Sequence, residues 1–561
     1  MARSAPTGPA DTHAHPVHPL GSRARVLLTS VFGPYAQDDE FGSRAINPME
    51  LYHNQVTRVQ GAFSLRAHHR SFGLMFIQAN IGADSTLLDF PTLRRFIHEI
   101  STKRYDVVGI SSIVMNVAKV DTMCRLVRRH LPGATIVVGG HVANHADIES
   151  RIDADHIVRG EGVRWMRRFL GEDEDAPLRH PRVTAGFNVR AMGIPIRRGR
   201  GDQPAVLIPS VGCPMGCNFC STSAMFGGKG KFVDFYRTGD QLFEVMCELE
   251  EDMKARSFFV MDENFLLHRE RALRLLDLMI EHDKAWALHV FSSAKVLRSY
   301  SMEQLVGLGL AWVWLGLEGE NSQYAKVRDV DTRELVRALQ AHGISVLGST
   351  IIGLEEHTGE NIDEAIEFAV SHDTEFHQFM LYTAVPGTPL HEDLRSRGVL
   401  LEPEEFPEAD AHGQLRFNFL HPKIRPGEET ELLLRAFRRD FAVNGPSVLR
   451  MARTVLRGWQ RYKAHPDRRI RRRFEWQARE LPVMFAGALW AARRSVRDSP
   501  MLSKRFSVIL KEIQDEFGLK SRMVAPLAGA YLRMMIAREE RRLGKGWTYE
   551  PPTVCETGPV P

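Results

Sequence analysis

Long hydrophobic runs are missing from this chain of 561 residues. No apolar stretch reaches the roughly 18 residues that a helix needs to cross a bilayer, so the sequence predicts no membrane-spanning segment. Cysteine is also scarce, with six residues in the whole chain, and no secretory signal is recognisable among the first residues. This pattern excludes a disulfide-stapled secreted fold and predicts a reducing, cytoplasmic compartment.

The bulk composition is that of an ordinary globular protein, with 43% hydrophobic and 25% charged residues. A chain of this length is too long for a single core, so several domains are expected. Residues 1–22 are rich in Pro and His and are expected to be a disordered leader. Residues 171–203 are charged and rich in Pro and Gly, and are expected to link two domains.

The net charge of +4 is unevenly distributed along the chain. From residue 425 to the end there are 28 Lys and Arg against 15 Asp and Glu, which gives this part a charge of +13 and leaves −9 for the rest. A basic C-terminal part attached to an acidic body indicates contact with something anionic.

The most informative motif is a group of three closely spaced cysteines, Cys213, Cys217 and Cys220. They follow a short apolar segment, residues 206–211, that reads as a strand. Three thiolates on one tight loop can hold three corners of a 4Fe–4S cube, whereas electron-carrying clusters normally have four protein ligands. An open metal position is typical of catalytic sites. The main alternative, a zinc site, lacks a fourth ligand nearby, because Cys247 falls in a helical pattern.

Apolar strands alternate with helices over residues 23–170. Buried strands in such an order are typical of a parallel, doubly wound α/β sheet, which binds ligands at the carboxyl ends of its strands. We therefore predict a Rossmann-type domain here. Its strand patterns are residues 25–32, 106–112, 135–140 and 156–162, with an amphipathic helix at 120–131.

A second series of strands and helices spans residues 204–402. Six βα units of this kind predict a partial TIM-type barrel, (β/α)6, with its chemistry at the carboxyl ends of the strands. The remaining residues, 403–561, carry helical patterns and predict a mostly α-helical domain. The predicted barrel strands are residues 205–211, 257–261, 287–292, 312–317, 345–352 and 378–383.

The spacing CxxxCxxC, with Phe219 just before the last cysteine, resembles the signature of the radical S-adenosylmethionine (SAM) superfamily. In that family SAM chelates the fourth iron of a 4Fe–4S cluster, and the reduced cluster cleaves the sulfonium to a 5′-deoxyadenosyl radical. The resemblance implies the three cysteines as metal ligands, and an external one-electron reductant of the flavodoxin or ferredoxin type as partner. It also implies that Phe219 packs on the adenine ring of SAM.

Segments at the ends of the predicted barrel strands resemble further SAM-contact motifs of this family. The acidic segment after the second strand matches the motif that contacts the SAM amino group, which makes Asp262 or Glu263 the candidate. For Asp262, capping of the following helix is an equal alternative. Glu318 matches the glutamate that accepts hydrogen bonds from the ribose hydroxyls. Gly353 and Pro386 lie in segments that match those after the fifth and sixth strands, the former backing the adenine.

The N-terminal pattern, followed by the cysteine motif, resembles the cobalamin-binding domain of the cobalamin-dependent radical SAM enzymes. The segments Val-Val-Gly-Gly at 137–140 and Arg-Gly-Glu-Gly at 159–162 are typical of that class. One departure is the missing DxHxxG loop, which supplies a histidine to cobalt in other cobalamin domains; residues 33–36 read Gly-Pro-Tyr-Ala. His141 could reach the lower face of the corrin or be an ordinary loop histidine. The implied cobalamin contacts are Ser111, Gly139, Gly140, His141 and Glu161.

A member of this class is expected to be a methyltransferase. We expect C-methylation of an unactivated C–H bond in an apolar, lipid-like substrate, with the 4Fe–4S cluster, SAM and cobalamin as cofactors. One alternative is a non-methylating radical reaction, such as cyclisation, carbon–carbon coupling or rearrangement. The other is an iron–sulfur sensor or nucleic-acid-binding protein, which the SAM-contact motifs disfavour because a sensor needs no ribose carboxylate. The residues do not name the substrate.

The basic C-terminal region, residues 429–561, mixes clustered Arg with apolar helical faces. Residues 481–490 form an apolar run that ends in Trp490 and is followed by Arg493 and Arg494, a combination that suits a membrane interface. We expect this region to contact the anionic inner face of a membrane peripherally. The alternative is a helical domain that only caps the barrel. Nucleic acid is a weaker candidate, because aromatic residues are not interleaved as stacking platforms.

Overall fold

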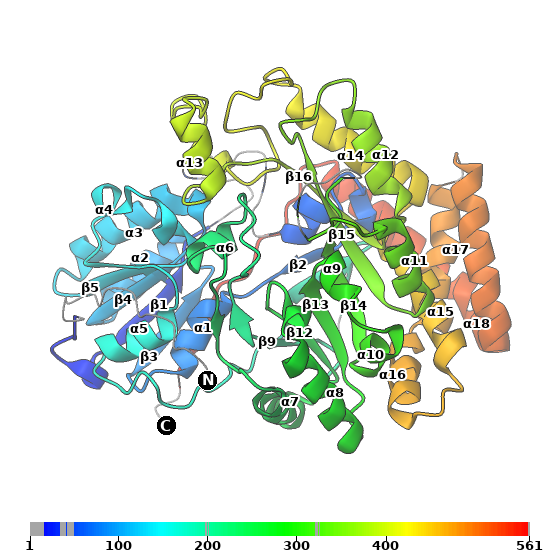
Figure 1. The fold of residues 1–561 in the computed structure, drawn as a ribbon, viewed down its shortest axis with the longest axis horizontal. Helices are drawn as coiled ribbons and strands as arrows, with labels where there is room; N and C mark the ends of the chain where they lie inside the picture. Colours follow the sequence, from blue (N-terminus) through cyan, green and yellow to red (C-terminus); the bar gives the residue numbers. More distant parts are fainter. Residues whose placement is uncertain are drawn as a thin grey trace, which may run out of the picture.

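The computed structural model describes residues 16–558, apart from 34–40, 42–45, 47–49, 197–198, 200, 320–323, 325 and 497. Residues 1–15 of the predicted leader lie outside the described residues, and so do positions 34–36 of the segment that replaces the DxHxxG loop. The chain forms an N-terminal α/β domain, a central barrel and a C-terminal group of helices (Figure 1). The fold class predicted from the sequence is confirmed.

The N-terminal domain is a parallel sheet with helices on both faces (Figure 1). The strand order β3-β1-β4-β5-β6 is that of a doubly wound fold. The central strands are apolar along their length because helices bury both of their faces. The strands are β1 (Val26–Ser30), β3 (Ser85–Asp89), β4 (Val107–Ser111), β5 (Thr135–Gly139) and β6 (His156–Val158), and the helices are α1 (Phe72–Ala79), α2 (Leu93–Thr102), α3 (Val117–His130), α4 (Ile148–Arg151) and α5 (Gly162–Phe169).

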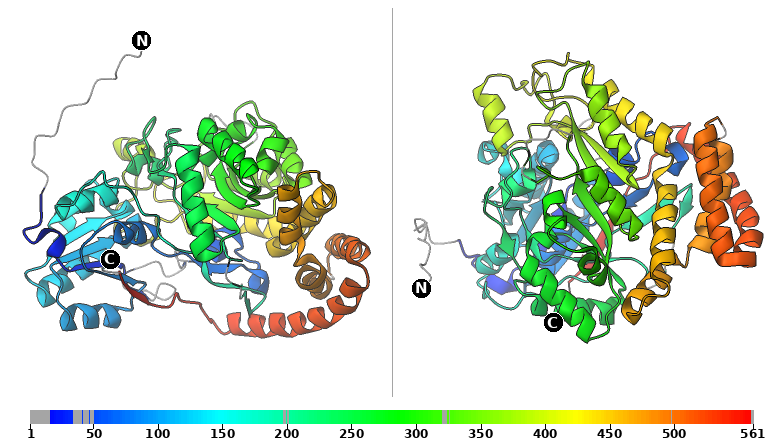
Figure 2. Two further views of the ribbon diagram at one scale, coloured as in Figure 1. Left: turned by 90° about the horizontal axis from the view of Figure 1, so that it is seen from below. Right: turned by 45° about the vertical axis from the view of Figure 1, so that its right-hand side comes forward.

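The C-terminal end of the described chain adds a strand to this sheet. β17 (Val554–Thr557) pairs antiparallel with the edge strand β3, and Glu556 forms an ion pair with Arg70 at 3.1 Å. Figure 2 shows the segment running back from the last helix to the N-terminal domain. Cys555, which the sequence places in a Pro-rich tail, therefore lies in a strand.

Six parallel strands form the barrel, in the order β9-β12-β13-β14-β15-β16. The six predicted strand ranges overlap them. Outward-facing side chains such as Phe258, Val290 and Val313 are fully buried beneath the helices. The strands are β9 (Ala205–Leu207), β12 (Ser257–Val260), β13 (Ala287–Ser292), β14 (Leu310–Gly316), β15 (Ser345–Ile352) and β16 (Phe376–Leu381), and the helices are α7 (Gly239–Met253), α8 (Arg269–Glu281), α9 (Ala294–Leu297), α10 (Met302–Gly307), α11 (Thr332–Ala341), α12 (Ile362–Ser371) and α13 (Pro389–Ser396).

The N-terminal segment before the first domain helix packs along the open side of the barrel. Its π-helical turn η2 (Tyr52–Val56) lies against β16, where the Nε2 of Gln378 donates to the Oε1 of Gln55 at 2.9 Å. Farther along, the ring of His69 stacks on Phe259 of β12. The strand β2 (Arg66–His68) pairs with β7 (Phe187–Ala191), which pairs with β8 (Ile194–Pro195). The expected linker, residues 171–203, therefore contains two short strands.

The C-terminal helices pack on the barrel and on each other. α14 lies against β16 and α12, and α17 lies along α18. Most of the apolar run 481–490, which we expect at a membrane interface, is inside this domain: Leu481 and Leu489 are 0% exposed, and the ring of Trp490 packs on Gly529. α18 covers these residues, which are therefore not available to a membrane, whereas Met484 is 43% exposed. The helices are α14 (Glu429–Asn444), α15 (Ser447–Tyr462), α16 (Arg468–Ala478), α17 (Ala486–Ser495) and α18 (Pro500–Leu543).

No helix in the described part of the chain has both the length and the apolar character that crossing a membrane requires.

Candidate active site

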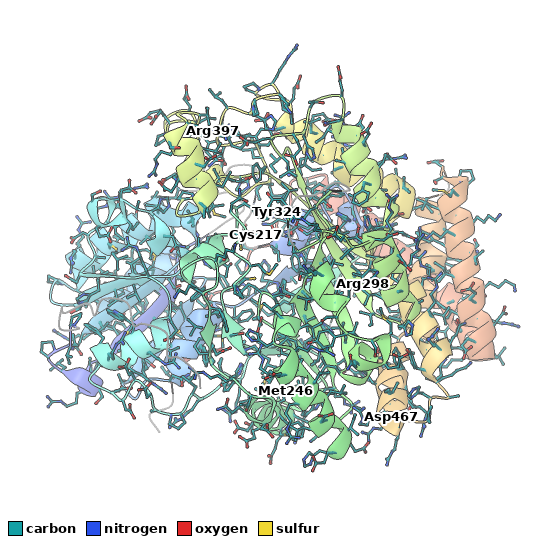
Figure 3. All side chains as sticks on the ribbon, in the orientation of Figure 1. Cys217, Met246, Arg298, Tyr324, Arg397 and Asp467 are labelled. Carbon is teal, nitrogen blue, oxygen red and sulfur yellow. The ribbon has the colours of Figure 1, made fainter. Side chains whose placement is uncertain are left out.

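The three cysteines of the motif lie on one loop above the carboxyl ends of the barrel strands; Figure 3 labels Cys217 there. The loop leads from β10 (Ser210–Val211) to α6 (Ser221–Met225). Gly216 has a φ of 64°, and a Cβ at this position would lie 2.5 Å from the Cβ of Lys229. Only glycine fits where the loop turns back so closely, which keeps the three thiols on one short curve.

The donor set of this loop fits an iron–sulfur cluster. Cys213, Cys217 and Cys220 are free thiols and partly exposed, and the backbone N–H of Ser223 donates to the Sγ of Cys220 at 3.5 Å. Hydrogen bonds to the ligand sulfurs help to set the reduction potential of an iron–sulfur cluster. Among the described residues, no three Cys, His, Asp or Glu side chains converge on one metal ion, and a cube does not require this because each thiolate binds a different iron.

Asp262 and Glu263 follow β12 and have different environments. Asp262 is buried, forms an ion pair with Arg271 at 2.7 Å and accepts a hydrogen bond from the backbone N–H of Asn264 at 3.0 Å. Glu263 instead has a buried Oε2 without a hydrogen-bond partner, and burial raises the pKa of its carboxyl to about 7. Buried polar atoms in proteins normally have a hydrogen-bond partner. The amino group of SAM would supply the donor that this oxygen lacks, so Glu263 is the better candidate for that contact.

Glu318 lies two residues after the end of β14 and pairs with a lysine that sequence reasoning missed. Its Oε1 lies 2.5 Å from the Nζ of Lys326, and its Oε2 is buried without a partner. The φ of Glu318 is 54°, a left-handed conformation that is strained for this residue and is concentrated at functional sites. The Nζ of Lys326 also lies 5.3 Å from the ring centre of Phe219 in the cysteine loop. Glu318 thus brings a free acceptor beside that loop, as a ribose contact requires.

The other predicted SAM contacts also lie around the cysteine loop. The ring of Phe219 packs edge-on against Tyr324 at 5.3 Å. Gly353 has a φ of 80°, and a Cβ there would lie 2.2 Å from the ring of Phe417, so only glycine fits. Pro386 lies in the loop between β16 and α13. The contact of each residue with SAM stays a prediction.

Four predicted cobalamin contacts come together at the carboxyl ends of β4 and β5, and they are Ser111, Gly139, Gly140 and His141. Gly140 has a φ of 82°, and a Cβ there would lie 2.7 Å from the Oγ of Ser111. The glycine lets two neighbouring loops meet at the edge where doubly wound sheets bind ligands. Small residues at the ends of these strands leave space for a bulky cofactor, so their chemistry fits cobalamin.

Glu161, the fifth predicted cobalamin contact, has a structural task in the fold. It is the N-cap of α5, and its carboxylate accepts hydrogen bonds from the backbone N–H groups of Val163 and Arg164. Such a cap stabilises a helix by about 1 kcal/mol. Its contact with cobalamin therefore stays a prediction.

The cobalamin-type edge of the N-terminal sheet faces the cysteine loop of the barrel. The Nε2 of His141 lies 3.5 Å from the Oγ1 of Thr222, two residues after Cys220. Burial lowers the pKa of His141, which favours its neutral form. A second contact between the two edges is made by Gly387, where a Cβ would lie 2.6 Å from the carbonyl oxygen of Asn144. The carboxyl ends of the two sheets therefore border one shared site.

Sequence reasoning missed the side chains that support the cysteine loop from segments that follow other barrel strands. Besides Lys326 they include Tyr324 and Tyr382, and the Nδ2 of Asn218 donates to the hydroxyl of Tyr382 at 3.1 Å. Figure 3 shows Tyr324 next to Cys217. The only available signal was the position of Tyr382 at the end of a predicted strand, because Tyr324 and Lys326 lie in a polar segment without periodicity.

Comparison with known proteins agrees with this two-domain site. The family model described as the radical SAM superfamily matches residues 207–369, and the model described as the B12 binding domain matches residues 62–170. These matches confirm the family resemblance that the sequence motifs predict.

Three relatives have related sequences. An uncharacterized methyltransferase of Pyrococcus horikoshii is 25% identical, over 53% of this chain and 71% of the relative. The bacteriochlorophyllide d C-12(1)-methyltransferase of Chlorobaculum tepidum is 26% identical, over 52% of this chain and 66% of the relative. The anaerobic magnesium-protoporphyrin IX monomethyl ester cyclase of Rubrivivax gelatinosus is 24% identical, over 61% and 67%. Residues 207–369 of the chain therefore form a domain of the radical SAM superfamily, and residues 62–170 form a B12-binding domain.

Proposed function

We propose that the protein methylates an unactivated carbon of an apolar substrate, as a cobalamin-dependent radical SAM methyltransferase. The observation that carries this proposal is the position of the cobalamin-type edge directly beside the cysteine loop, with His141 against Thr222. A methyl donor and a radical source must reach the same substrate carbon, so their sites have to border one space. Relatives that are named as methyltransferases support the reaction class.

The residues of this chain position the cofactors and protect the reaction. When bound, the cluster and SAM supply a 5′-deoxyadenosyl radical and cobalamin supplies a methyl group. Cys213, Cys217 and Cys220 would hold the cluster, while Glu263 and Glu318 would accept hydrogen bonds from the amino group and the ribose of SAM. Phe219 and Tyr324 pack edge-on beside the loop, and apolar rings at this place would limit the access of water to a reactive carbon centre.

A non-methylating radical reaction is the second candidate. The observation that favours it is the similarity to a relative named as a cyclase, whose alignment with this chain is the longest of the three. The two candidates differ in product mass, because methylation adds one methylene unit, whereas ring closure removes hydrogen.

We expect the anaerobically reconstituted protein to retain hydroxocobalamin through gel filtration and to produce 5′-deoxyadenosine. With SAM carrying a deuterated methyl group and an apolar extract of cells that lack the protein, one extract component should gain the labelled methyl group. Untargeted mass spectrometry detects this gain. Loss of hydrogen without label would favour the cyclising candidate, and loss of all corrinoid on the column would contradict the cobalamin assignment.

We also propose that peripheral membrane contact is made by α18. Five large apolar side chains on this helix are 52–74% exposed, and their spacing of three or four residues places them on one face. The opposite face, with Ala525, Leu532 and Ile536, packs into the C-terminal domain. The exposed residues are Leu519, Met523, Leu527, Tyr531 and Met534.

The charges around this face of α18 favour an anionic lipid surface. Residues 517–538 contain Lys520, Arg522, Arg533 and Arg538 and no Asp or Glu. A helix with an apolar face and basic flanks suits the interface of an anionic membrane. Pairing of two copies through the same face would instead bring like charges together, which disfavours a dimer.

The double variant Leu519→Asp/Leu527→Asp should lose binding to vesicles that contain anionic phosphatidylglycerol. Both side chains are exposed, so the fold should tolerate the change, and each basic residue near the surface contributes about 1 kcal/mol to binding. Co-sedimentation at low salt measures the effect, and Ile280→Asp, at an exposed position of α8, is the matched control. Equal binding of the double variant, or a dimer of the wild type in place of vesicle binding, would contradict the proposal.

A further inference from the structure

Lys326 brings a positive charge to the cysteine loop. It lies in the segment after β14, and its Nζ is 5.3 Å from the ring centre of Phe219, which stands between Cys217 and Cys220 in the loop. The ring centre of Tyr324 lies 5.9 Å from the same nitrogen. Aromatic faces attract cations at such distances. The two rings therefore help to hold the ammonium group beside the loop.

A carboxylate completes the surroundings of this ammonium group. The Oε1 of Glu318 lies 2.5 Å from the Nζ of Lys326, and the two side chains are 3% and 18% exposed. A Cβ at Gly316 would lie 2.8 Å from that oxygen and 2.9 Å from that nitrogen. Any larger residue at position 316 would displace the pair. The ion pair is thus built into the end of β14 and is not a loose surface contact.

The side chain of Lys326 carries its charge in this environment. Burial disfavours the ammonium form, but the attraction of Glu318 and of the thiolate forms of Cys217 and Cys220 outweighs it and raises the pKa of Lys326. The same attraction acts on the loop: burial raises the pKa of Cys217, and Lys326 opposes this rise. The ammonium group is therefore close enough to stabilise negative charge on the cysteine loop.

Negative charge is also what reduction adds to an iron–sulfur cluster. One electron enters from an external reductant, and no bond forms or breaks in this step. A positive charge near the cluster stabilises the reduced form more than the oxidised form, and a negative charge has the opposite effect. The net charge of the site is accordingly one of the properties that set the reduction potential of a cluster.

We propose that Lys326 sets the reduction potential of the cluster. Its ammonium group makes the cluster easier to reduce, and Glu318 limits this effect because it neutralises part of the charge. The rings of Phe219 and Tyr324 fix the place from which the charge acts. Lys326 is thus a positioning residue, whose task is to place a cation beside the cluster. The inference rests on the proposed function only for the statement that the cysteine loop holds the cluster.

The closing experiment measures the midpoint potential of the reconstituted full-length protein without SAM, by titration with titanium(III) citrate and electron paramagnetic resonance. We expect Lys326→Met to shift the midpoint to a more negative potential. The reduced-to-oxidised ratio at a fixed potential should fall roughly 10-fold, the order expected for one unit charge in a partly buried site. Glu318→Gln should shift the midpoint in the positive direction, because the ammonium group then acts unopposed. Lys326→Arg keeps the charge and should stay near the wild-type midpoint.

Lys229→Met is the matched control for this series. Lys229 also lies against the cysteine loop, because a Cβ at Gly216 would be 2.5 Å from its Cβ. Its side chain is exposed, however, so water weakens the effect of its charge. The midpoint of Lys229→Met should therefore be close to that of the wild type.

Three results would overturn the inference: a wild-type midpoint for Lys326→Met, an equal shift for Lys326→Arg and Lys326→Met, or shifts of the same sign for Lys326→Met and Glu318→Gln. The last result is what a purely structural role of the ion pair predicts.

A double variant covers the case in which Lys326→Met loses its cluster because Glu318 is left buried without its partner. Glu318→Gln/Lys326→Met leaves no lone buried charge at this place. Its midpoint should be more negative than that of Glu318→Gln alone, and equal midpoints would count against the proposal. The titration needs neither SAM nor substrate, so its outcome is independent of the methylation assay.

Discussion

Replacing Cys217 by Ala should remove the iron–sulfur cluster and reduce SAM cleavage to background. The loop carries three thiols, and two thiolates cannot hold three corners of the cube. Iron and sulfide analysis, the visible absorbance of the reconstituted protein, and 5′-deoxyadenosine production measure the effect. Because Cys217 is partly exposed, little loss of unfolding free energy is expected from the lost side-chain packing.

Cys247→Ala is the matched control for this experiment. Cys247 lies on α7 and packs against the barrel core, away from the loop. The variant should keep full iron content and full SAM cleavage, at a cost of about 1 kcal/mol or less in stability. If the Cys217→Ala protein retained iron and 5′-deoxyadenosine production at the level of Cys247→Ala, the cluster would be assigned to the wrong residues.

Replacing Glu263 by Gln should weaken SAM binding roughly 10-fold to 150-fold. This range corresponds to the about 1.5–3 kcal/mol that a hydrogen bond to a charged group contributes. The Oε2 of Glu263 has no partner inside the protein, so the change should not lower stability and removes a buried carboxylate whose pKa burial has raised. Calorimetric titration of the cluster-loaded protein with SAM, together with thermal unfolding, measures both effects.

The neighbouring carboxylate provides the contrast. Asp262→Asn removes the closer of the two carboxylates that pair with the buried guanidinium of Arg271, which then keeps only Asp234 at 3.5 Å. Breaking a buried ion pair costs up to about 3–5 kcal/mol. We therefore expect Asp262→Asn to lower the unfolding temperature, while Glu263→Gln does not. If the two variants exchanged these phenotypes, the SAM contact would belong to Asp262 and the structural role to Glu263.

The sequence by itself determined the two α/β domains and the family resemblance, and it predicts the cluster ligands. The strands β1, β4, β5 and β12–β16 are short apolar runs between amphipathic helices. Such a pattern lies in consecutive residues, so it can be recognised without knowing which segments pack against it. Cys213, Cys217 and Cys220 are equally local, because a tight loop fixes which metal chemistry they can support. The outward positions of the barrel strands were predictable as core for the same reason.

Only the tertiary structure decided which of two adjacent carboxylates is free. Asp262 and Glu263 have the same chemistry and adjacent positions, and the difference is made by Arg271, which arrives from α8 to neutralise one of them. Likewise, Lys326 is identified as a partner of Glu318 only by their contact beside the cysteine loop. Partner choice of this kind depends on three-dimensional contact and leaves no periodic trace in the sequence.

Dependence on three-dimensional contact also explains why the surroundings of the run 481–490 and of the strand β17 were not predicted. The run 481–490 is apolar enough for a membrane interface, but α18 buries most of it and exposes an apolar face of its own. The strand β17 is polar and short, and it forms because the edge of β3 offers unpaired backbone groups. A local pattern shows that a surface must be covered, whereas the partner that covers it is selected by packing between segments far apart in the chain.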